Sequence, residues 1–294
     1  MTKATSPEPL IDSVESYLHT IFELHQIERN SVRCFRGQGD STWSLSPTIM
    51  HGNLVSNAEN QIISELMMET PDAFANDKYM FDRLVRARHY GLPTRLLDVS
   101  LNPLVSLYFA CSDESTRDKE SLVVCLDFDR SRVKFADSDV ISLISNLSRL
   151  SDDERYAIRE GKEQYNTDRT TNKDEGLTAF RGLPAVKRLI QFVREEKPYF
   201  ENAINPDDLF KYFFVYPKKS NVRLIAQSGV FVAAGLMEFK RLSSGKIKKT
   251  NIKIKTNSKQ AIIKQLDSIN INQRTIYPEI DSITKYIHNN WKKS

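Results

Sequence analysis

The side chains of this chain that could do chemistry gather in and around a short polar strand. The strand is predicted over Thr94–Ser100, between two turn signals. It contains Arg95, Asp98 and Ser100. A strand that only filled a hydrophobic core would not need an arginine, an aspartate and a serine so close together. This stretch is therefore the first candidate for a site.

Two further polar residues belong to other predicted elements. Arg36 lies on an early strand and is followed by Gly37 and Gly39. Glycines let a backbone approach phosphate closely, and an arginine beside them binds phosphate oxygens through several N–H donors. Gln227 precedes a late apolar strand, 230–234. The sequence therefore predicts three segments, far apart in the chain, that carry polar candidates.

The same charges also have a purely structural interpretation. Arg36 and Arg95 could pair with Asp98 and Asp40 in a buried network that specifies the fold. A buried charge is costly unless it is paired, so such a cluster marks either a network or a site. The sequence leaves both interpretations open.

Length and composition predict one globular unit. The 294 residues include 40% hydrophobic and 27% charged side chains, which is ordinary for a domain with an ample core. No apolar run approaches the roughly 20 residues that a membrane span needs, and the polar N-terminus holds no signal core. We therefore expect a cytoplasmic protein without membrane contact. Residues 1–10 are predicted to be a disordered lead-in, and residues 11–294 a single domain.

Cysteine and histidine patterns predict no metal site. Cys34, Cys111 and Cys125 form no CxxC pair and lie in apolar segments, as expected for reduced core residues. The five histidines show no metal-ligand spacing.

The C-terminal part of the domain, 239–294, begins with a lysine-rich stretch. Nine basic residues and no acidic residue fall between Phe239 and Leu266, in a chain of net charge +4. A solvated strand and helix would explain this pattern, and so would a surface for a polyanion. Lysines without interleaved aromatic residues favour phosphate contacts over base stacking. The candidate nucleic-acid contacts are Lys246, Lys248, Lys249, Lys253 and Lys255.

Periodicity predicts short strands among many helices. Strands are expected over 32–39, 94–100, 122–126, 213–217, 230–234 and 248–255. Helices are expected over 12–29, 57–69, 103–111, 138–150, 185–195, 220–229, 258–270 and 281–291, and one more is expected within 73–90. The highly polar region 151–175 is predicted to be an exposed helix with a mobile loop. The expected fold class is α+β, with a mixed sheet surrounded by helices.

Several of these segments carry a family resemblance. In chain order the motifs are Phe35-Arg36-Gly37-Gln38, Trp43–Pro47, Arg88–Asp98, Asn102-Pro103-Leu104 and Ala226–Phe231. Together they resemble the FRG domain family, named for its Phe-Arg-Gly motif. The resemblance implies a bacterial stress or phage-defence protein rather than a metabolic enzyme.

A weaker resemblance points to ADP-ribosyltransferases of the Arg-Ser-Glu type, and it implies an ADP-ribosyltransferase-like sheet core. Arg36 matches that family's arginine on an early strand, and Leu97–Ser100 with the helix after it matches the serine-containing element. Gln227 occupies the position of the glutamate ahead of a late strand. The resemblance implies NAD as co-substrate and Arg36, Ser100 and Gln227 as catalytic residues. Gln227 is a departure, because the family's carboxylate holds the ribose and stabilises the cationic transition state.

Cleavage of the nicotinamide–ribose bond creates an oxocarbenium-like centre. An NAD site needs a cation for the pyrophosphate, an acceptor for the ribose hydroxyls and an aromatic wall for nicotinamide. The residues implied in NAD binding are Arg36, Gly37, Gln38, Arg95, Asp98 and Tyr108, with Tyr90 or Phe109 as other candidates for the wall.

These resemblances imply an NAD-dependent ADP-ribosyltransferase that acts as a toxin or phage-defence effector. The acceptor could be RNA, DNA, protein or water, and the lysine-rich stretch favours nucleic acid. A toxin would also need a neutralising antitoxin partner. The alternative function is a non-catalytic module of the same fold that binds a nucleotide or nucleic acid, and the glutamine at position 227 favours it.

Overall fold

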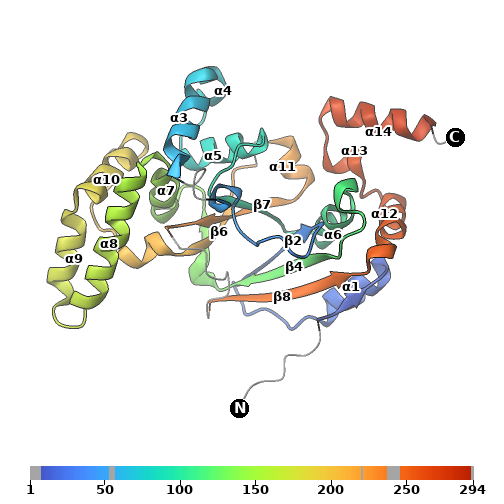
Figure 1. The fold of residues 1–294 in the computed structure, drawn as a ribbon, viewed down its shortest axis with the longest axis horizontal. Helices are drawn as coiled ribbons and strands as arrows, with labels where there is room; N and C mark the ends of the chain where they lie inside the picture. Colours follow the sequence, from blue (N-terminus) through green and yellow to red (C-terminus); the bar gives the residue numbers. More distant parts are fainter. Residues whose placement is uncertain (1–7, 53–56, 220, 237–245, 293–294) are drawn as a thin grey trace, which may run out of the picture.

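A mixed eight-stranded sheet forms the centre of the computed structural model, which describes residues 8–52, 57–219, 221–236 and 246–292 (Figure 1). The strands are β1 (Leu10–Ile11), β2 (Val32–Gln38), β3 (Leu96–Ser100), β4 (Ser121–Phe128), β5 (Val133–Phe135), β6 (Tyr212–Tyr216), β7 (Gly229–Ala234) and β8 (Ile247–Ile254). Their order in the sheet is β1-β8-β4-β2-β3-β7-β6-β5. The pairs β1–β8 and β5–β6 are parallel, and the other pairs are antiparallel.

Helices cover the sheet and extend beyond both of its ends (Figure 1). They are α1 (Val14–Glu23), α3 (Glu59–Glu69), α4 (Pro71–Phe74), α5 (Met80–His89), α6 (Pro103–Cys111), α7 (Asp139–Asn146), α8 (Asp152–Asp168), α9 (Lys173–Gly182), α10 (Pro184–Glu196), α11 (Val222–Ala226), α12 (Lys259–Ser268), α13 (Gln273–Ile276) and α14 (Ile280–Lys292). The predicted α+β class is confirmed.

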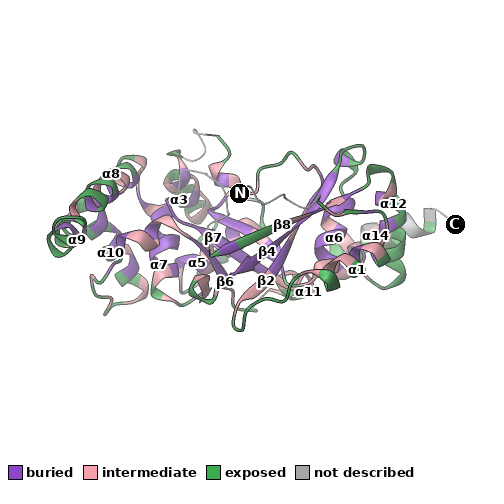
Figure 2. Cartoon of the chain, turned by 90° about the horizontal axis from the view of Figure 1, so that it is seen from below, coloured by how far each residue is buried: buried purple, intermediate pink, exposed green. Residues whose placement is uncertain are grey.

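The central strands of the sheet are largely buried, whereas β8 is partly exposed, as the purple and green strands of Figure 2 show. Every residue of β4 is buried, which explains its continuous apolar run. Helices α1, α6 and α12 pack on one face, and α5 and α7 pack on the other. Helices α8, α9 and α10 share a separate apolar core with α7 at one end of the molecule.

Helix α6 begins where the sequence predicts it. The Asn102 side chain accepts a hydrogen bond from the Leu104 N–H at 2.9 Å, and Pro103 occupies the first helical position. The helix is apolar on nearly all sides because it lies buried against β2 and β4. Because α6 is buried, it fixes the position of the C-terminal end of β3, which precedes it directly in the chain.

Several predicted elements differ from the structure. The helix expected within 73–90 is α5, and the short helix α4 before it was not predicted. The polar region 151–175 contains the predicted helix, α8, which buries only one stripe of its surface, and an exposed turn and the start of α9 follow it. The lead-in lies mainly outside the described residues, but Leu10 belongs to β1, so the predicted disorder over 1–10 is wrong at that residue.

Arg95 belongs to a buried charge network, as one interpretation of the sequence allowed, but its partner is Glu59. Its guanidinium is buried and donates to both carboxylate oxygens of Glu59, with Nε at 2.9 Å from Oε1. Arg155 of α8 donates to Oε2 of the same carboxylate at 3.1 Å. Burial lowers the pKa of Arg95, and the Glu59 charge opposes that effect. The expected pairing of Arg95 with Asp98 or Asp40 is therefore wrong: Arg95 joins α3, β3 and α8 instead.

We predict that Glu59→Gln lowers the free energy of unfolding by about 3 kcal/mol or more, because it leaves two buried arginines without their carboxylate. Chemical denaturation would measure the loss. Glu65→Gln, on the exposed face of the same helix, is the matched control and should change stability by less than about 0.5 kcal/mol. Equal effects of the two variants would contradict a central role for this network.

Candidate functional site

The sheet opens between β2 and β3. These neighbouring strands share one residue pair, Phe35 with Ser100, whereas β2 and β4 pair along seven residues. Arg36 reaches across the opening, and its NH1 group donates to the backbone carbonyl of Asp98 at 2.6 Å. A side chain thus takes the place of backbone ladder bonds at this point of the sheet.

Strand register brings three distant segments to this opening. Phe35 on β2 pairs with Ser100 on β3, and Ser100 pairs with Gly229 on β7. Arg36 is next to the first residue of this row, and Gln227 is two residues before the last. The three predicted catalytic residues therefore surround one cavity, whose volume is about 400 Å³. That volume lies within the usual range for small-ligand sites.

The cavity has a cationic polar wall and an apolar wall. Its polar lining consists of Arg36, Arg88, His89, Asp98, Ser100, Ser106, Asn221, Arg223 and Gln227. Its larger apolar residues are Phe35, Val85, Val99, Phe109, Leu224, Val230 and Phe231. Three arginines against one aspartate leave an excess of two positive charges, so the cavity favours an anionic ligand.

Arg36 retains binding capacity that the protein does not use. Its Nε is buried and finds no hydrogen-bond partner among the described residues. Burial lowers the pKa of Arg36, while the Asp98 charge opposes this. An arginine nevertheless stays protonated in proteins. A buried donor without a partner is costly, so this arginine differs from the fully hydrogen-bonded Arg95.

Asp98 is held in place by a second arginine. Arg88, near the end of α5, donates from Nε to Asp98 Oδ2 at 2.8 Å, and its NH2 lies 2.8 Å from the same oxygen. Arg88 also donates to Thr48 Oγ1 at 3.2 Å. The Asp98 side chain remains 46% exposed, so its carboxylate can still accept hydrogen bonds from a ligand.

Ser100 and Gln227 are engaged in holding the cavity together. Ser100 Oγ donates to the Gln227 backbone carbonyl at 2.7 Å and accepts from the Asn102 N–H at 2.9 Å. The Gln227 side chain donates from Nε2 to the Ile276 carbonyl at 3.2 Å. A glutamate at position 227 could not make this last bond, because a carboxylate has no donor.

Three residues assigned to NAD binding lie outside the cavity lining. Arg95 belongs to the Glu59 network. Gln38 is buried and donates to the Trp43 carbonyl at 3.2 Å. Tyr108 faces the core, where burial raises its pKa to about 12. Among the aromatic candidates Phe109 lines the cavity, whereas Tyr90 is 71% exposed and does not.

Sequence reasoning missed Arg88, His89 and Arg223 as cavity residues. The motif that contains Arg88 and His89 was part of the family resemblance, but no spacing rule directs a helix end toward a particular strand. Burial and the nearby Arg223 lower the pKa of His89, while Glu279 opposes both effects.

Gly37 lines the cavity and also packs closely against helix α6. A Cβ placed on Gly37 would lie 1.9 Å from the Ser106 carbonyl oxygen and 2.7 Å from the Ala110 nitrogen. Strand β2 therefore lies directly on the backbone of α6 at this residue. The glycine lets strand and helix approach closely enough to form the floor of the cavity.

The lysine-rich stretch is largely neutralised where it is described. Lys246 pairs with Asp129, Lys255 pairs with Asp12, and Lys253 pairs with Glu8 and Glu120. Lys248 and Lys249 are exposed on β8, and Lys240 and Arg241 lie outside the described residues. Lys259, which the sequence placed on this surface, is buried and donates to the carbonyls of Gly39 and Thr116.

Three further observations concern metal ligands, cysteines and membrane-spanning helices. Within the described ranges, no three His, Cys, Asp or Glu side chains gather closely enough to hold a metal ion. All three cysteines are free and buried, and burial raises the pKa values of Cys111 and Cys125 to about 12. Among the helices that the structure describes, none combines the length and apolar character that crossing a bilayer requires.

Comparison with known families gives one match. Residues 31–119 match the model of the FRG domain. Segment 31–119 is similar to the FRG domain family, and it covers less than half of the chain. The matched segment contains β2, β3, α5 and α6, so the FRG domain supplies Arg36, Asp98 and the floor of the cavity. No curated protein and no solved structure matches this chain.

We predict that Gly37→Ala destabilises the protein by about 3 kcal/mol, because the added methyl group meets backbone atoms that cannot move aside. Gly182→Ala is the control: its Cβ meets nothing within 4 Å at the end of α9. That variant should be neutral or more stable by up to about 1 kcal/mol. Thermal unfolding of both variants would test the contrast, and a stable Gly37→Ala protein would contradict the close strand–helix packing.

His89 should make stability fall in acid. Its folded pKa lies below the ordinary value of 6.5, so the unfolded chain binds the proton more readily. Its contribution is present above about pH 6.5 and is lost as the pH falls through the lowered value. His89→Gln should flatten that part of the plot of unfolding free energy against pH, whereas His288→Gln, at an exposed position, should not. An unchanged slope in His89→Gln would contradict the assignment.

Proposed function

We propose that this protein is an NAD-dependent ADP-ribosyltransferase whose substrate binds in the cavity between β2 and β3. The observation that carries the proposal is the position of Arg36. It lies at an opening of the sheet, in an apolar-walled cavity with excess positive charge, and keeps a buried donor free. A pyrophosphate group matches this arrangement in charge and in hydrogen-bonding capacity.

Each wall of the cavity fits one part of NAD. Arg36 and Arg223 would bind the pyrophosphate, and the exposed part of Asp98 would accept hydrogen bonds from ribose hydroxyls. Phe109 and the apolar wall would receive the nicotinamide ring. In the reaction the bond between nicotinamide and ribose C1 breaks with its electron pair on nicotinamide, and an acceptor atom forms the new bond to C1.

In this proposal the protein acts as a toxin or phage-defence effector, and its acceptor is RNA or another nucleic acid. Acidic partners neutralise Lys246, Lys253 and Lys255 of the lysine-rich stretch. The exposed Lys248 and Lys249 remain available for phosphate contacts. A neutralising antitoxin partner belongs to the same proposal.

A second candidate function is a nucleotide-binding module without catalysis. The observation that favours it is the amide of Gln227, which is bonded to the Ile276 carbonyl where a transferase would use a carboxylate. NAD cleavage distinguishes the two functions, since both predict binding and only the transferase predicts nicotinamide release.

We predict that Arg36→Lys reduces nicotinamide release from labelled NAD on the order of 100-fold, because a single ammonium group cannot hold the Asp98 carbonyl and a phosphate in the same geometry. The assay would include RNA, DNA and cell lysate as acceptors. Arg33→Lys is the matched control on the same strand, since Arg33 pairs with Asp127 away from the cavity. It should retain the activity.

Two results would contradict this proposal. Nicotinamide release by Arg36→Lys at the rate of the unchanged protein would remove Arg36 from the reaction. Binding of NAD without release under every condition would leave the nucleotide-binding module as the function.

A further inference from the structure

A short C-terminal segment, Ile276–Glu279, contacts several residues that line the cavity. The Ile276 carbonyl accepts from Gln227, and the Tyr277 ring packs edge-on against Phe109 with centroids 6.2 Å apart. The guanidinium of Arg223 lies over the same Tyr277 ring, 4.7 Å from its centroid. Gln227, Phe109 and Arg223 all line the cavity. The segment is therefore part of the structure that shapes the site.

Glu279 is the anion nearest to Arg223 among the described ion pairs. One of its carboxylate oxygens lies 3.8 Å from Arg223 NH1 and 4.0 Å from His89 Nε2. Both oxygens are sealed from solvent, and neither accepts a hydrogen bond in the part of the chain that the structure describes. A sealed carboxylate without hydrogen bonds is poorly stabilised, so this contact is electrostatic and incomplete.

Arg223 could therefore pair with either of two anions. One is Glu279, which is too far away for a hydrogen bond. The other is an anionic ligand in the cavity, whose lining carries excess positive charge. A phosphate oxygen in the cavity could bond to the guanidinium at normal distance, which is the stronger interaction. The Arg223 side chain is 33% exposed, so it can reach such a ligand.

We propose that Arg223 forms an anion subsite for a phosphate of the ligand, and that Glu279 occupies this subsite electrostatically until the ligand displaces it. The identity of the ligand rests on the proposed function. The competition between Glu279 and a phosphate for Arg223 does not. A ligand that bonds Arg223 better than Glu279 does will shift the segment away from the cavity.

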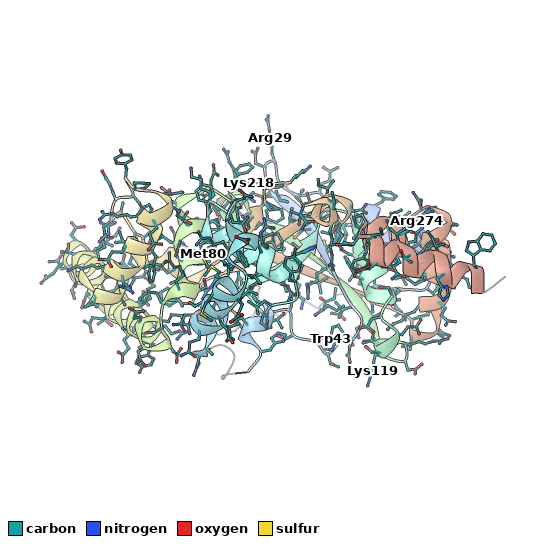
Figure 3. The ribbon with its side chains drawn as sticks, turned by 90° about the horizontal axis from the view of Figure 1, so that it is seen from above. Arg29, Trp43, Met80, Lys119, Lys218 and Arg274 are labelled. Carbon is teal, nitrogen blue, oxygen red and sulfur yellow. The ribbon has the colours of Figure 1, made fainter. Side chains whose placement is uncertain are left out.

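The segment is connected to the rest of the C-terminal region. Arg274 of α13 lies over the Tyr286 ring of α14 at 5.5 Å, and Figure 3 shows Arg274 at the end of the molecule that carries α14. The N–H groups of Ser282 and Ile283 donate to the Glu279 carbonyl at 3.0 and 3.1 Å. Release of Glu279 should therefore loosen the start of α14.

Calorimetric titration with inorganic pyrophosphate tests the subsite. Glu279→Gln should bind pyrophosphate about fivefold more tightly than the unchanged protein, because the competing charge is gone. Arg223→Gln should bind it about tenfold more weakly or worse. Asp281→Asn, which removes an exposed charge two residues further on, is the matched control and should leave the affinity unchanged.

Amide hydrogen exchange of the unchanged protein gives a second test that needs no variant. Pyrophosphate should speed exchange over residues 276–283, and ADP-ribose should do the same. Equal or weaker pyrophosphate binding by Glu279→Gln, no pyrophosphate binding, or unchanged exchange in this segment would overturn the proposal. Because pyrophosphate has no glycosidic bond, these results are independent of whether the protein cleaves NAD.

Discussion

The bond from Arg36 to the Asp98 carbonyl is the interaction on which the site depends. It bridges β2 and β3 at the point where their backbone ladder is reduced to one pair. Without the opening there would be no cavity, and without the guanidinium the edge of the opening would expose a carbonyl that no strand satisfies. The same side chain thus joins the two strands and keeps its Nε donor without a partner among the described residues.

Helix α6 provides the floor that this arrangement needs. Gly37 lets β2 lie directly on the helix backbone, and Asn102 fixes the start of the helix immediately after β3. The Ser106 hydroxyl is buried in this floor without a hydrogen-bond partner among the described residues. The Phe-Arg-Gly segment can therefore be understood as one unit: an apolar residue toward the core, an arginine toward the cavity, and a glycine where the helix passes.

The charged residues around Glu59 and those around the cavity differ in how completely they are hydrogen-bonded. In the Glu59 network, Arg95 and Arg155 share one carboxylate and make several short hydrogen bonds, as a fold-specifying network should. Around the cavity, Arg36 keeps a free donor and Arg223 is 3.8 Å from its nearest carboxylate. The charged groups of the Glu59 network have their hydrogen-bond partners, whereas those around the cavity, which we assign to a ligand, lack some of theirs.

The sequence by itself determined the fold class, the helix start at Asn102, and the three segments that carry Arg36, Ser100 and Gln227. Local patterns suffice there, because capping residues and apolar runs act over a few positions. Only the tertiary structure decided that Arg95 turns to Glu59, that Arg88 rather than Arg36 binds the Asp98 carboxylate, and that Lys259 is buried. It also brought Glu279 to Arg223 across more than fifty residues of chain. Long side chains take their partners from strand register and helix packing, which no local spacing records.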